Sequence, residues 1–472
     1  MNTGCMFTFA VMAMYTRHRK GILLLLLTLT GACHHQTKLS MEFQEVQLTD
    51  TRQGHTLHNT QVFSNDGQWI VYDTRNDDTQ IGSTGCIEMV HVGTGEIRTL
   101  YRTAHQTAFG PGVGAATFSP AEDRVLFIHG IRNADTSRPY GITRRTGVAI
   151  DIQRPQQPIF MDARNITPPF TPGALRGGTH AHSWSSDGQW ISFTYNDYIL
   201  EQLSLTDSTV RDLRTVGIMT PMPVDVPADS SLENNSGACF AVIVTEVTER
   251  PRPESDEIDK AFDECWVGTD GYRKPGGTCQ RRAIAFQGNV RNAEGNTVTE
   301  VFVADLPDRF PMEPDERPLE GTPTSRPGVP KGIVQRRVTY SHTGVSGPRH
   351  WLRTTPDGQL ICYLAPDHNG IIQIFGVSPN GGTPVAITRN DVSVDGPFNI
   401  DPSGTWVAYP ADNSVFLTGI FTGNTHRITK RFADETKPVG APNWSPDGRA
   451  IAYNRYVSYG DDRYLQIFLL QR

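Results

Sequence analysis

The sequence predicts an all-β fold, a seven-bladed β-propeller that is closed by an N-terminal strand. Three observations predict it: a short turn motif occurs six times, the same two apolar positions follow every copy, and strand-like segments lie between the copies. A unit of roughly 40–50 residues that repeats and holds four short strands is typical of a propeller. The length of 472 residues suits a fold that grows by repetition.

The clearest copy of the turn motif is Trp-Ser-Pro-Asp-Gly at residues 444–448. Pro presets φ at the second position of the turn, Asp tolerates the third, and Gly adopts the positive φ that closes the hairpin. The six turns begin at Ser64, Ser119, Ser185, Thr355, Asp401 and Ser445. In every copy a β-branched residue lies six positions after the first turn residue, and an aromatic residue lies eight positions after it. Because strand side chains alternate between faces, we predict that these two residues pack on the same face.

The repeats do not divide the chain evenly. The last three turns are 46 and 44 residues apart, but 170 residues separate Ser185 from Thr355. Strand-like segments at residues 240–247, 283–286 and 299–304 predict one further unit in this interval, which gives seven blades; six or eight blades are also compatible with the sequence. We predict insertions around residues 214–239 and 248–282. The second insertion is expected to hold a short helix at residues 255–266, capped by Ser255.

Residues 42–51 resemble the ends of later units, at residues 384–388 and 426–429. The last unit has room for strands at residues 450–456 and 464–470, and it then lacks an outer strand. An unpaired sheet edge favours aggregation, so we predict that residues 42–51 supply the missing strand and close the ring. The propeller is therefore expected to span residues 42–472.

The N-terminus predicts a secretory signal at residues 1–32. A basic group at residues 17–20 precedes an apolar run at residues 22–29 that is too short to span a bilayer. Cys33 follows Thr-Gly-Ala and resembles the lipobox of bacterial lipoproteins, although Leu29 lies four residues before the Cys instead of three. The resemblance implies a lipid anchor on Cys33 and a tether at residues 33–41. A plain secretory signal is the alternative, and Met14 would give a more typical signal length than Met1.

Under the sorting rule known for bacterial lipoproteins, the non-acidic His34 after Cys33 implies the periplasmic side of the outer membrane. Contact with the membrane is then expected through the lipid anchor alone.

Composition argues against binding of nucleic acid, because the net charge is −7 and no basic stripe is present. Cys265 and Cys279 lie fourteen residues apart in a Gly- and Pro-rich segment. In an oxidising periplasm this spacing predicts a disulfide bond. Cys86, Cys239 and Cys362 lie in or beside strand-like runs and are expected to be buried as hydrophobic residues.

The turn unit, with Ile-Ala-Tyr after it, resembles the repeat of TolB-type propellers. Longer strings resemble the YidR-type family of TolB-like propellers, at residues 171–182, 193–197, 255–258, 266–268, 334–337 and 348–351. The resemblance spans about residues 42–472. It implies the propeller fold and does not imply a reaction.

Three histidines precede turns at similar positions. His180 and His182 lie five and three residues before Ser185, and His350 lies five residues before Thr355. The innermost strand of a blade begins at the central funnel, so equivalent positions on different blades are expected to converge, and residues two apart to point the same way. Neutral imidazole binds Mn and Zn, and the arrangement resembles the metal site of oligogalacturonate lyases, which are also propellers. In the alternative interpretation these histidines line a wet channel or form hydrogen bonds across blades.

Signals for catalysis are few, and we assign no catalytic residue. The sequence has no Gly-x-Ser-x-Gly elbow, no P-loop and no dinucleotide-binding Gly motif. Arg176 and Arg349 are predicted to bind an anionic ligand in the funnel. We therefore predict a lipoprotein propeller that acts as a binding scaffold for an envelope protein or for a small anionic ligand or saccharide. The alternative is a metal-dependent polysaccharide lyase that uses the funnel histidines, with Mn or Zn as the cofactor.

Overall fold

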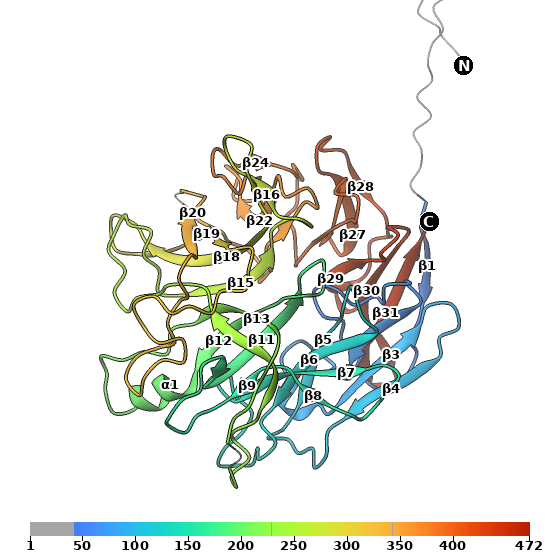
Figure 1. Ribbon diagram of the computed structural model, residues 1–472. Helices are drawn as coiled ribbons and strands as arrows, with labels where there is room; N and C mark the ends of the chain where they lie inside the picture. The colour runs from blue at the N-terminus through green and yellow to red at the C-terminus, as the bar shows by residue number, and fades with distance from the viewer. Residues whose placement is uncertain (1–41, 228, 342) are drawn as a thin grey trace, which may run out of the picture. The chain divides into compact units, whose positions relative to one another are not determined.

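The computed structural model describes residues 42–227, 229–341 and 343–472. Seven antiparallel sheets of three or four strands form the blades, which we number 1 to 7 (Figure 1), and two further pairs of short strands lie outside them. Blades 1 to 3 comprise β2 (Trp69–Asp73), β3 (Cys86–His91) and β4 (Ile97–Arg102); β5 (Val113–Phe118), β6 (Arg124–Gly130), β7 (Arg145–Asp151) and β8 (Ile159–Phe160); and β11 (Gly177–Trp184), β12 (Ile191–Asp197), β13 (Thr215–Val224) and β14 (Gly237–Ile243).

Blades 4 and 5 comprise β15 (Ala261–Trp266), β18 (Arg282–Arg291), β19 (Thr297–Leu306) and β20 (Val334–Arg337); and β21 (Arg353–Thr354), β22 (Ile361–Pro366), β23 (Ile372–Val377) and β24 (Val385–Ala386). Blades 6 and 7 comprise β25 (Asn399–Ile400), β26 (Trp406–Ala411), β27 (Ser414–Gly419) and β28 (Thr425–Arg427); and β29 (Pro438–Trp444), β30 (Ala450–Tyr459), β31 (Asp462–Gln471) and β1 (Gln44–Gln47). The remaining elements are β9 (Ala163–Arg164), β10 (Ala174–Leu175), β16 (Tyr272–Arg273), β17 (Cys279–Gln280), α1 (Tyr198–Ser204), η1 (Ile81–Ser83) and η2 (Asp434–Thr436).

The ring is closed by a strand from the other end of the propeller sequence. β1 pairs antiparallel with β31, from Gln44 opposite Gln471 to Gln47 opposite Phe468. Figure 1 shows the blue β1 beside the red β31. The predicted seven blades and the predicted closure by an N-terminal strand are both confirmed. In blade 1 the innermost position is taken by residues 56–63, which bridge to β2 at both ends.

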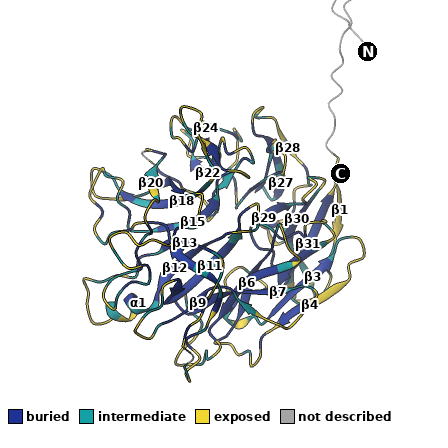
Figure 2. Cartoon of the chain, in the orientation of Figure 1, coloured by how far each residue is buried: buried dark blue, intermediate teal, exposed yellow. Residues whose placement is uncertain are grey.

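The hydrophobic core is divided into layers between neighbouring blades. Seven clusters of buried side chains each combine residues of two consecutive blades, and one of them joins blade 7 to blade 1. Figure 2 shows the strands mostly buried, with exposed residues in the loops and in the outer strand β4. Each blade is therefore stabilised by its two neighbours, as in other repeat folds.

The two apolar positions after each turn form these layers. Ile191 and Phe193 of blade 3 are fully buried against Leu126 and Ala149 of blade 2. The corresponding pairs in the other blades lie in the layer toward the preceding blade. Blade 4 keeps the pair as Ile284 and Phe286, although it lacks the turn motif. The expectation that the two positions share a face is confirmed.

Side chains fix the geometry of the turns. Ser445 donates from Oγ to Asp447 Oδ1 at 2.6 Å and accepts from the backbone N–H of Ala450 at 2.9 Å. Gly448 adopts φ of 70°, the left-handed region that glycine enters without a steric penalty. The same Oγ-to-carboxylate bond recurs in the turns that begin at Ser64, Ser185 and Thr355.

The predicted insertions are largely strands. Residues 214–239 supply β13 and the start of β14, and residues 240–247 lie in or directly after β14 in blade 3 rather than in blade 4. The predicted helix at residues 255–266 is absent, because residues 261–266 form β15, the innermost strand of blade 4. Ala261 donates its N–H to Arg214 O at 2.9 Å, and β15 pairs with β18. This pairing outweighs the local helix signals. The insertion within blade 4 is the hairpin of β16 and β17.

The one α-helix among the described residues, α1, has seven residues, and Asp197 caps it by accepting from Leu200 N at 3.0 Å. None of the helices in the described part is long and apolar enough to cross a membrane. The predicted signal at residues 1–32, the anchor Cys33 and the tether at residues 33–41 lie outside the described residues.

Candidate ligand-binding site

A segment of blade 1, residues 57–61, passes through the centre of the ring. Gln61 exchanges two hydrogen bonds with the backbone of Trp184 in blade 3, each of 3.0 Å. Asn59 O accepts from Arg353 Nη2 in blade 5 and from Asn399 Nδ2 in blade 6, both at 2.8 Å. A segment that bonds to three blades that are not its neighbours must lie at the axis. We call residues 57–61 the axial segment.

The axial segment is also tied to blade 7. Asn443 Nδ2 donates to His58 O at 3.0 Å, and Leu57 N donates to Asn454 Oδ1 at 2.9 Å. Desolvation lowers the pKa of Arg353 to about 10, and each of its hydrogen bonds in the structure goes to a neutral oxygen. The axial segment therefore fills the channel with a network of satisfied polar groups.

A pocket of about 360 Å³, which we call the funnel pocket, lies against the axial segment. Six of the seven blades contribute to its wall, and blade 4 is the exception. The pocket lining includes Leu57, His58, His180, Arg349, Trp351 and Val439. Pro348, Pro397, Pro410 and Pro438 add rigid apolar surface. A concave, mostly apolar site with a few convergent polar groups is the usual form of a small-molecule site.

His180 and Arg349 form the polar part of the funnel pocket. Arg349 Nη2 lies 3.4 Å from His180 Nε2, and Arg349 also pairs with Asp263 at 3.0 Å. Because a guanidinium only donates, His180 Nε2 is the acceptor and Nδ1 carries the proton. The buried Nδ1 has no hydrogen-bond partner among the described residues. The guanidinium of Arg349 also lies 4.5 Å from the ring centre of Trp351.

Both histidines of the funnel pocket are neutral. Burial lowers the pKa of His180 well below 6.5, and the nearby cations Arg145, Arg349 and Arg214 lower it further. Burial likewise lowers the pKa of His58, with Arg75 and Arg353 as the next causes. The two rings therefore act as neutral hydrogen-bonding groups at physiological pH.

The three predicted metal ligands are not brought together. The strand β11 has a bulge between His180 and Ser183, with Ala181 at φ of 55°, so His180 and His182 do not share a face. His182 is fully buried, bonds Thr179 Oγ1 at 3.0 Å and packs toward Gly147 of blade 2. Of the three predicted ligands, only His180 lines the funnel pocket.

His350 is occupied by backbone groups on both nitrogens. Its Nδ1 donates to Pro348 O at 2.9 Å, and its Nε2 accepts from Leu364 N at 3.0 Å. In the described part of the chain no group of three or more His, Cys, Asp or Glu residues is arranged to hold a metal ion. The residues present therefore do not fit the predicted Mn or Zn site.

Arg176 does not reach the funnel. Its side chain is 1% exposed, pairs with Asp197 at 2.8 Å, and donates to the backbone oxygens of Thr322 and Ser325. It joins blade 3 to the loop before β20, which is a structural role in place of the predicted role in ligand binding. Arg349, with 52% of its side chain exposed, remains available at the funnel.

The structure contradicts the predicted disulfide between Cys265 and Cys279. Both are free thiols. Cys265 packs in the layer between blades 4 and 5, whereas Cys279 is exposed on the β16–β17 hairpin with its sulfur 3.8 Å from Asp270 O. Cys86, Cys239 and Cys362 are buried, as predicted.

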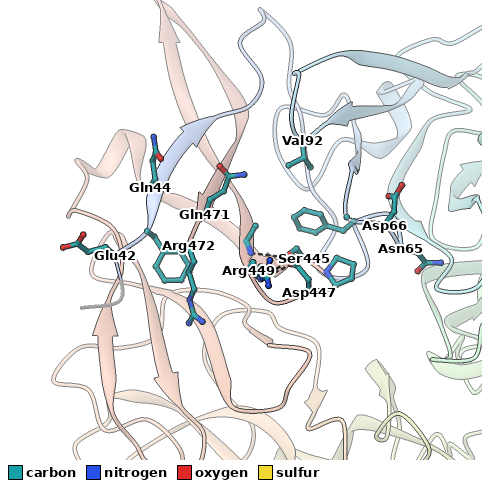
Figure 3. A pocket seen from close by; sticks show the side chains of 15 residues that line it. Glu42, Gln44, Asn65, Asp66, Val92, Ser445, Asp447, Arg449, Gln471 and Arg472 are labelled. Atoms are coloured by element: carbon teal, nitrogen blue, oxygen red, sulfur yellow. Dashed lines mark hydrogen bonds and ion pairs between the residues drawn. The ribbon is translucent and has the colours of Figure 1, made fainter. Parts of the chain in front are cut away.

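A larger pocket of about 690 Å³ lies where blade 7 meets blade 1 (Figure 3). It is formed by repeat turns and by the ends of β1 and β31, and it carries charges of both signs, as Asp66 and Arg449 illustrate. Figure 3 shows Ser445 and Asp447 beside each other, and these side chains are bonded within their own turn. Because Asp66, Ser445 and Asp447 are already bonded within the repeat turns, we take the funnel pocket as the candidate site.

Sequence reasoning missed four residues near the funnel: Trp351, Arg145, Arg214 and Lys260. Arg214 and Lys260 line a pocket of about 330 Å³ that shares Pro348 and Arg349 with the funnel pocket; we call it the side pocket. Lys260 directly precedes β15. The pair Ile284 and Phe286 repeats the spacing of the two apolar positions that follow each turn, so it could have located the innermost strand of blade 4 on its N-terminal side.

Comparisons with known proteins found similar sequences and structures. The family model "Protein of unknown function (DUF3748)" matches residues 112–232. Among solved structures, an oligogalacturonate lyase in complex with manganese is 11% identical, with a TM-score of 0.47 and coverage of 91% of this chain and 98% of that chain. TolB from Acinetobacter baumannii is 13% identical, with a TM-score of 0.36 and coverage of 86% and 81%.

The uncharacterized protein YidR of Escherichia coli strain K12 is 36% identical over 416 residues, which is 86% of this chain and 94% of the relative. Similarity at this level over nearly all of both chains shows common descent. The chain belongs to the YidR family.

Proposed function

We propose that this protein is a ligand-binding propeller that takes one small molecule into the funnel pocket. The observation that carries the proposal is the funnel pocket itself, because side chains from six blades converge on it and the axial segment fills the channel beside it. A site assembled from six blades of a rigid ring is preformed, and a preformed site avoids the entropy cost of ordering on binding.

The lining indicates how a ligand would be held. Leu57, Val439 and the prolines offer apolar contact, and Arg349, with 52% of its side chain exposed, offers guanidinium N–H donors. His180 Nδ1 and Trp351 Nε1 also lack partners among the described residues, but both atoms are buried and would reach a ligand only if their side chains moved. The donors of Arg349 favour a ligand that brings hydrogen-bond acceptors.

The cellular setting belongs to the proposal as well. The pattern that ends at Cys33 supports a lipid anchor, and His34 supports the periplasmic side of the outer membrane. In that setting the propeller would present the funnel pocket to small molecules of the envelope, with a membrane contact through the anchor.

A metal-dependent lyase is not part of the proposal. Such a lyase requires His180, His182 and His350 around one ion. His182 instead points toward blade 2, and both ring nitrogens of His350 are hydrogen-bonded to backbone groups. A binding role needs no such centre.

The proposal is tested by filling the pocket. Val439 is partly buried on β29 and lines the funnel pocket, so Val439→Trp introduces an indole into the space. Val385→Trp on the outer strand β24, where Val385 is 52% exposed, is the matched control. Native mass spectrometry of protein purified from envelope extract, followed by calorimetry, identifies a bound molecule and its affinity. We expect Val439→Trp to abolish binding and Val385→Trp to keep it; equal binding by both variants would contradict the proposal.

A further inference from the structure

The side pocket concentrates positive charge at the edge of the funnel. Arg214 and Lys260 line it together with Arg349. Arg214 and Lys260 are held side by side, because Ala261 N, the next residue after Lys260, donates to Arg214 O at 2.9 Å. Arg349 extends across Trp351 from the funnel pocket to the side pocket and lines both.

A fourth cation, Arg145, acts through its charge on Arg214 and His180, whose pKa values it lowers. Arg145 is the first residue of β7 and is 5% exposed. Its Nη1 donates to Tyr140 Oη at 3.3 Å, and its buried Nε has no partner among the described residues. After burial, Arg145 and Arg349 are the two charges that lower the pKa of Arg214 most.

The negative charge near these cations does not balance them. In the described residues Arg145, Arg214 and Lys260 have no salt bridge, and Arg349 pairs with Asp263. Asp259, beside Lys260, is already paired with Arg291. Asp212 accepts from Asn196 and from Asp197 N, and burial raises its pKa to about 6. Cations gathered in a partly desolvated pocket repel one another, and an added anion would relieve that cost.

We propose that the side pocket binds the anionic group of the funnel ligand, with Arg214, Lys260 and Arg349 as its contacts and Arg145 as supporting charge. The ligand class is a small organic anion that carries a carboxylate or phosphate group beside an apolar part. This inference rests on the proposed function, since the apolar part would occupy the adjoining funnel pocket. Guanidinium groups suit both kinds of oxyanion, because their N–H groups donate in a planar fork.

The experiment measures binding of two probes, citrate and inorganic phosphate, by calorimetry to the purified protein at fixed ionic strength. Lys260→Gln and Arg214→Gln each remove one cation, and we expect each to weaken probe binding about tenfold. Lys331→Gln is the matched control, because Lys331 is 63% exposed and pairs with Glu313 at the surface. Binding of citrate alone assigns a carboxylate, and binding of phosphate alone assigns a phosphate group.

A variant that binds the probes more tightly shows that changes in probe affinity do not come from a loss of folding. Asp263→Asn removes the one carboxylate that pairs with Arg349, and Asn tolerates the φ of 49° at this position. We expect Asp263→Asn to bind the probes several-fold more tightly. Equal probe affinity in Lys260→Gln and Lys331→Gln, or no binding of either probe, would overturn the anion site. Val439 does not line the side pocket, so Val439→Trp keeps probe binding even if the funnel proposal fails.

Discussion

Gln61 of blade 1 and Trp184 of blade 3 are joined by two hydrogen bonds of 3.0 Å, one in each direction between the Gln61 amide and the Trp184 backbone. Blade 2 lies between these blades in the chain, so the contact bypasses a neighbour. The amide takes the place of a strand partner for the innermost strand of blade 3. It fixes the axial segment, and the axial segment bounds the funnel pocket.

Gln61→Ala should lower the free energy of unfolding by about 2 kcal/mol, because it leaves the Trp184 N–H and C=O without partners. The measurement is urea unfolding followed by tryptophan fluorescence. Gln359→Ala, at an exposed turn position, is the control and should change stability by less than about 0.5 kcal/mol. Equal stability of the two variants would show that the axial segment is not held by this pair.

His180→Ala and His350→Ala should differ in stability although the chemical change is the same. His350→Ala leaves the buried Leu364 N–H without its acceptor and should cost about 1–3 kcal/mol. His180→Ala removes the 3.4 Å contact with Arg349, which stays paired with Asp263, and should cost less than about 1 kcal/mol, while it weakens ligand binding. Thermal unfolding and calorimetry separate the two effects. A stoichiometric Mn or Zn that is lost in both variants would restore the metal-site hypothesis.

Glu264 should make stability depend on pH. Burial raises its pKa from 4.5 to about 8, and neither carboxylate oxygen has a hydrogen-bond partner among the described residues. The folded state therefore holds a proton that the unfolded state releases above its own pKa. The contribution of Glu264 is fully present below pH 4.5 and is lost as the pH rises through about 8. Glu264→Gln, which mimics the protonated form, should remove this loss and gain at least about 1 kcal/mol over wild type at pH 8.

The control for this experiment is Glu294→Gln, at an exposed turn position. Urea unfolding at pH 5 and at pH 8 gives the comparison. A stability difference between Glu264→Gln and wild type that is the same at both pH values would contradict the buried, protonated carboxyl group.

Cys33→Ala should convert the protein from a detergent-phase to an aqueous-phase protein in a phase-partition assay, because the thiol is the predicted site of lipid attachment. Incorporation of labelled fatty acid into wild type and not into the variant is the second readout. Cys279→Ala, at an exposed cysteine of the propeller, is the matched control. Aqueous partition of the wild-type protein would favour the plain secretory signal.

The repeats made the architecture predictable. Six turns with the same Ser/Thr/Asp start and the same two apolar positions supply both the blade spacing and the packed face, and these are local properties of the chain. The sequence predicted blade 4 only in part. Its turn motif is replaced by the β16–β17 hairpin, although the apolar pair Ile284 and Phe286 is retained. Residues 261–266 carry helix-start signals on their N-terminal side, and only pairing with β18 decides that they form a strand.

The candidate site was less predictable, because it depends on the direction of single side chains. The bulge at Ala181 turns His182 away from the face of His180, and a bulge in an inner strand leaves no clear sequence signal. Arg349 lines the funnel pocket, whereas Arg176 points into a loop contact that forms only when residues 322–325 fold against it. Lys260 was missed because residues 255–266 were predicted to form a helix, whereas Lys260 directly precedes strand β15.

The central claim is that the funnel pocket is the binding site, and the most direct measurement is a crystal structure of the protein with the molecule that it retains from the envelope. We predict electron density bounded by His180, Trp351 and Arg349, with the anionic group directed toward Arg214 and Lys260. Density in the pocket between blades 7 and 1, with the funnel pocket filled by solvent alone, would contradict it.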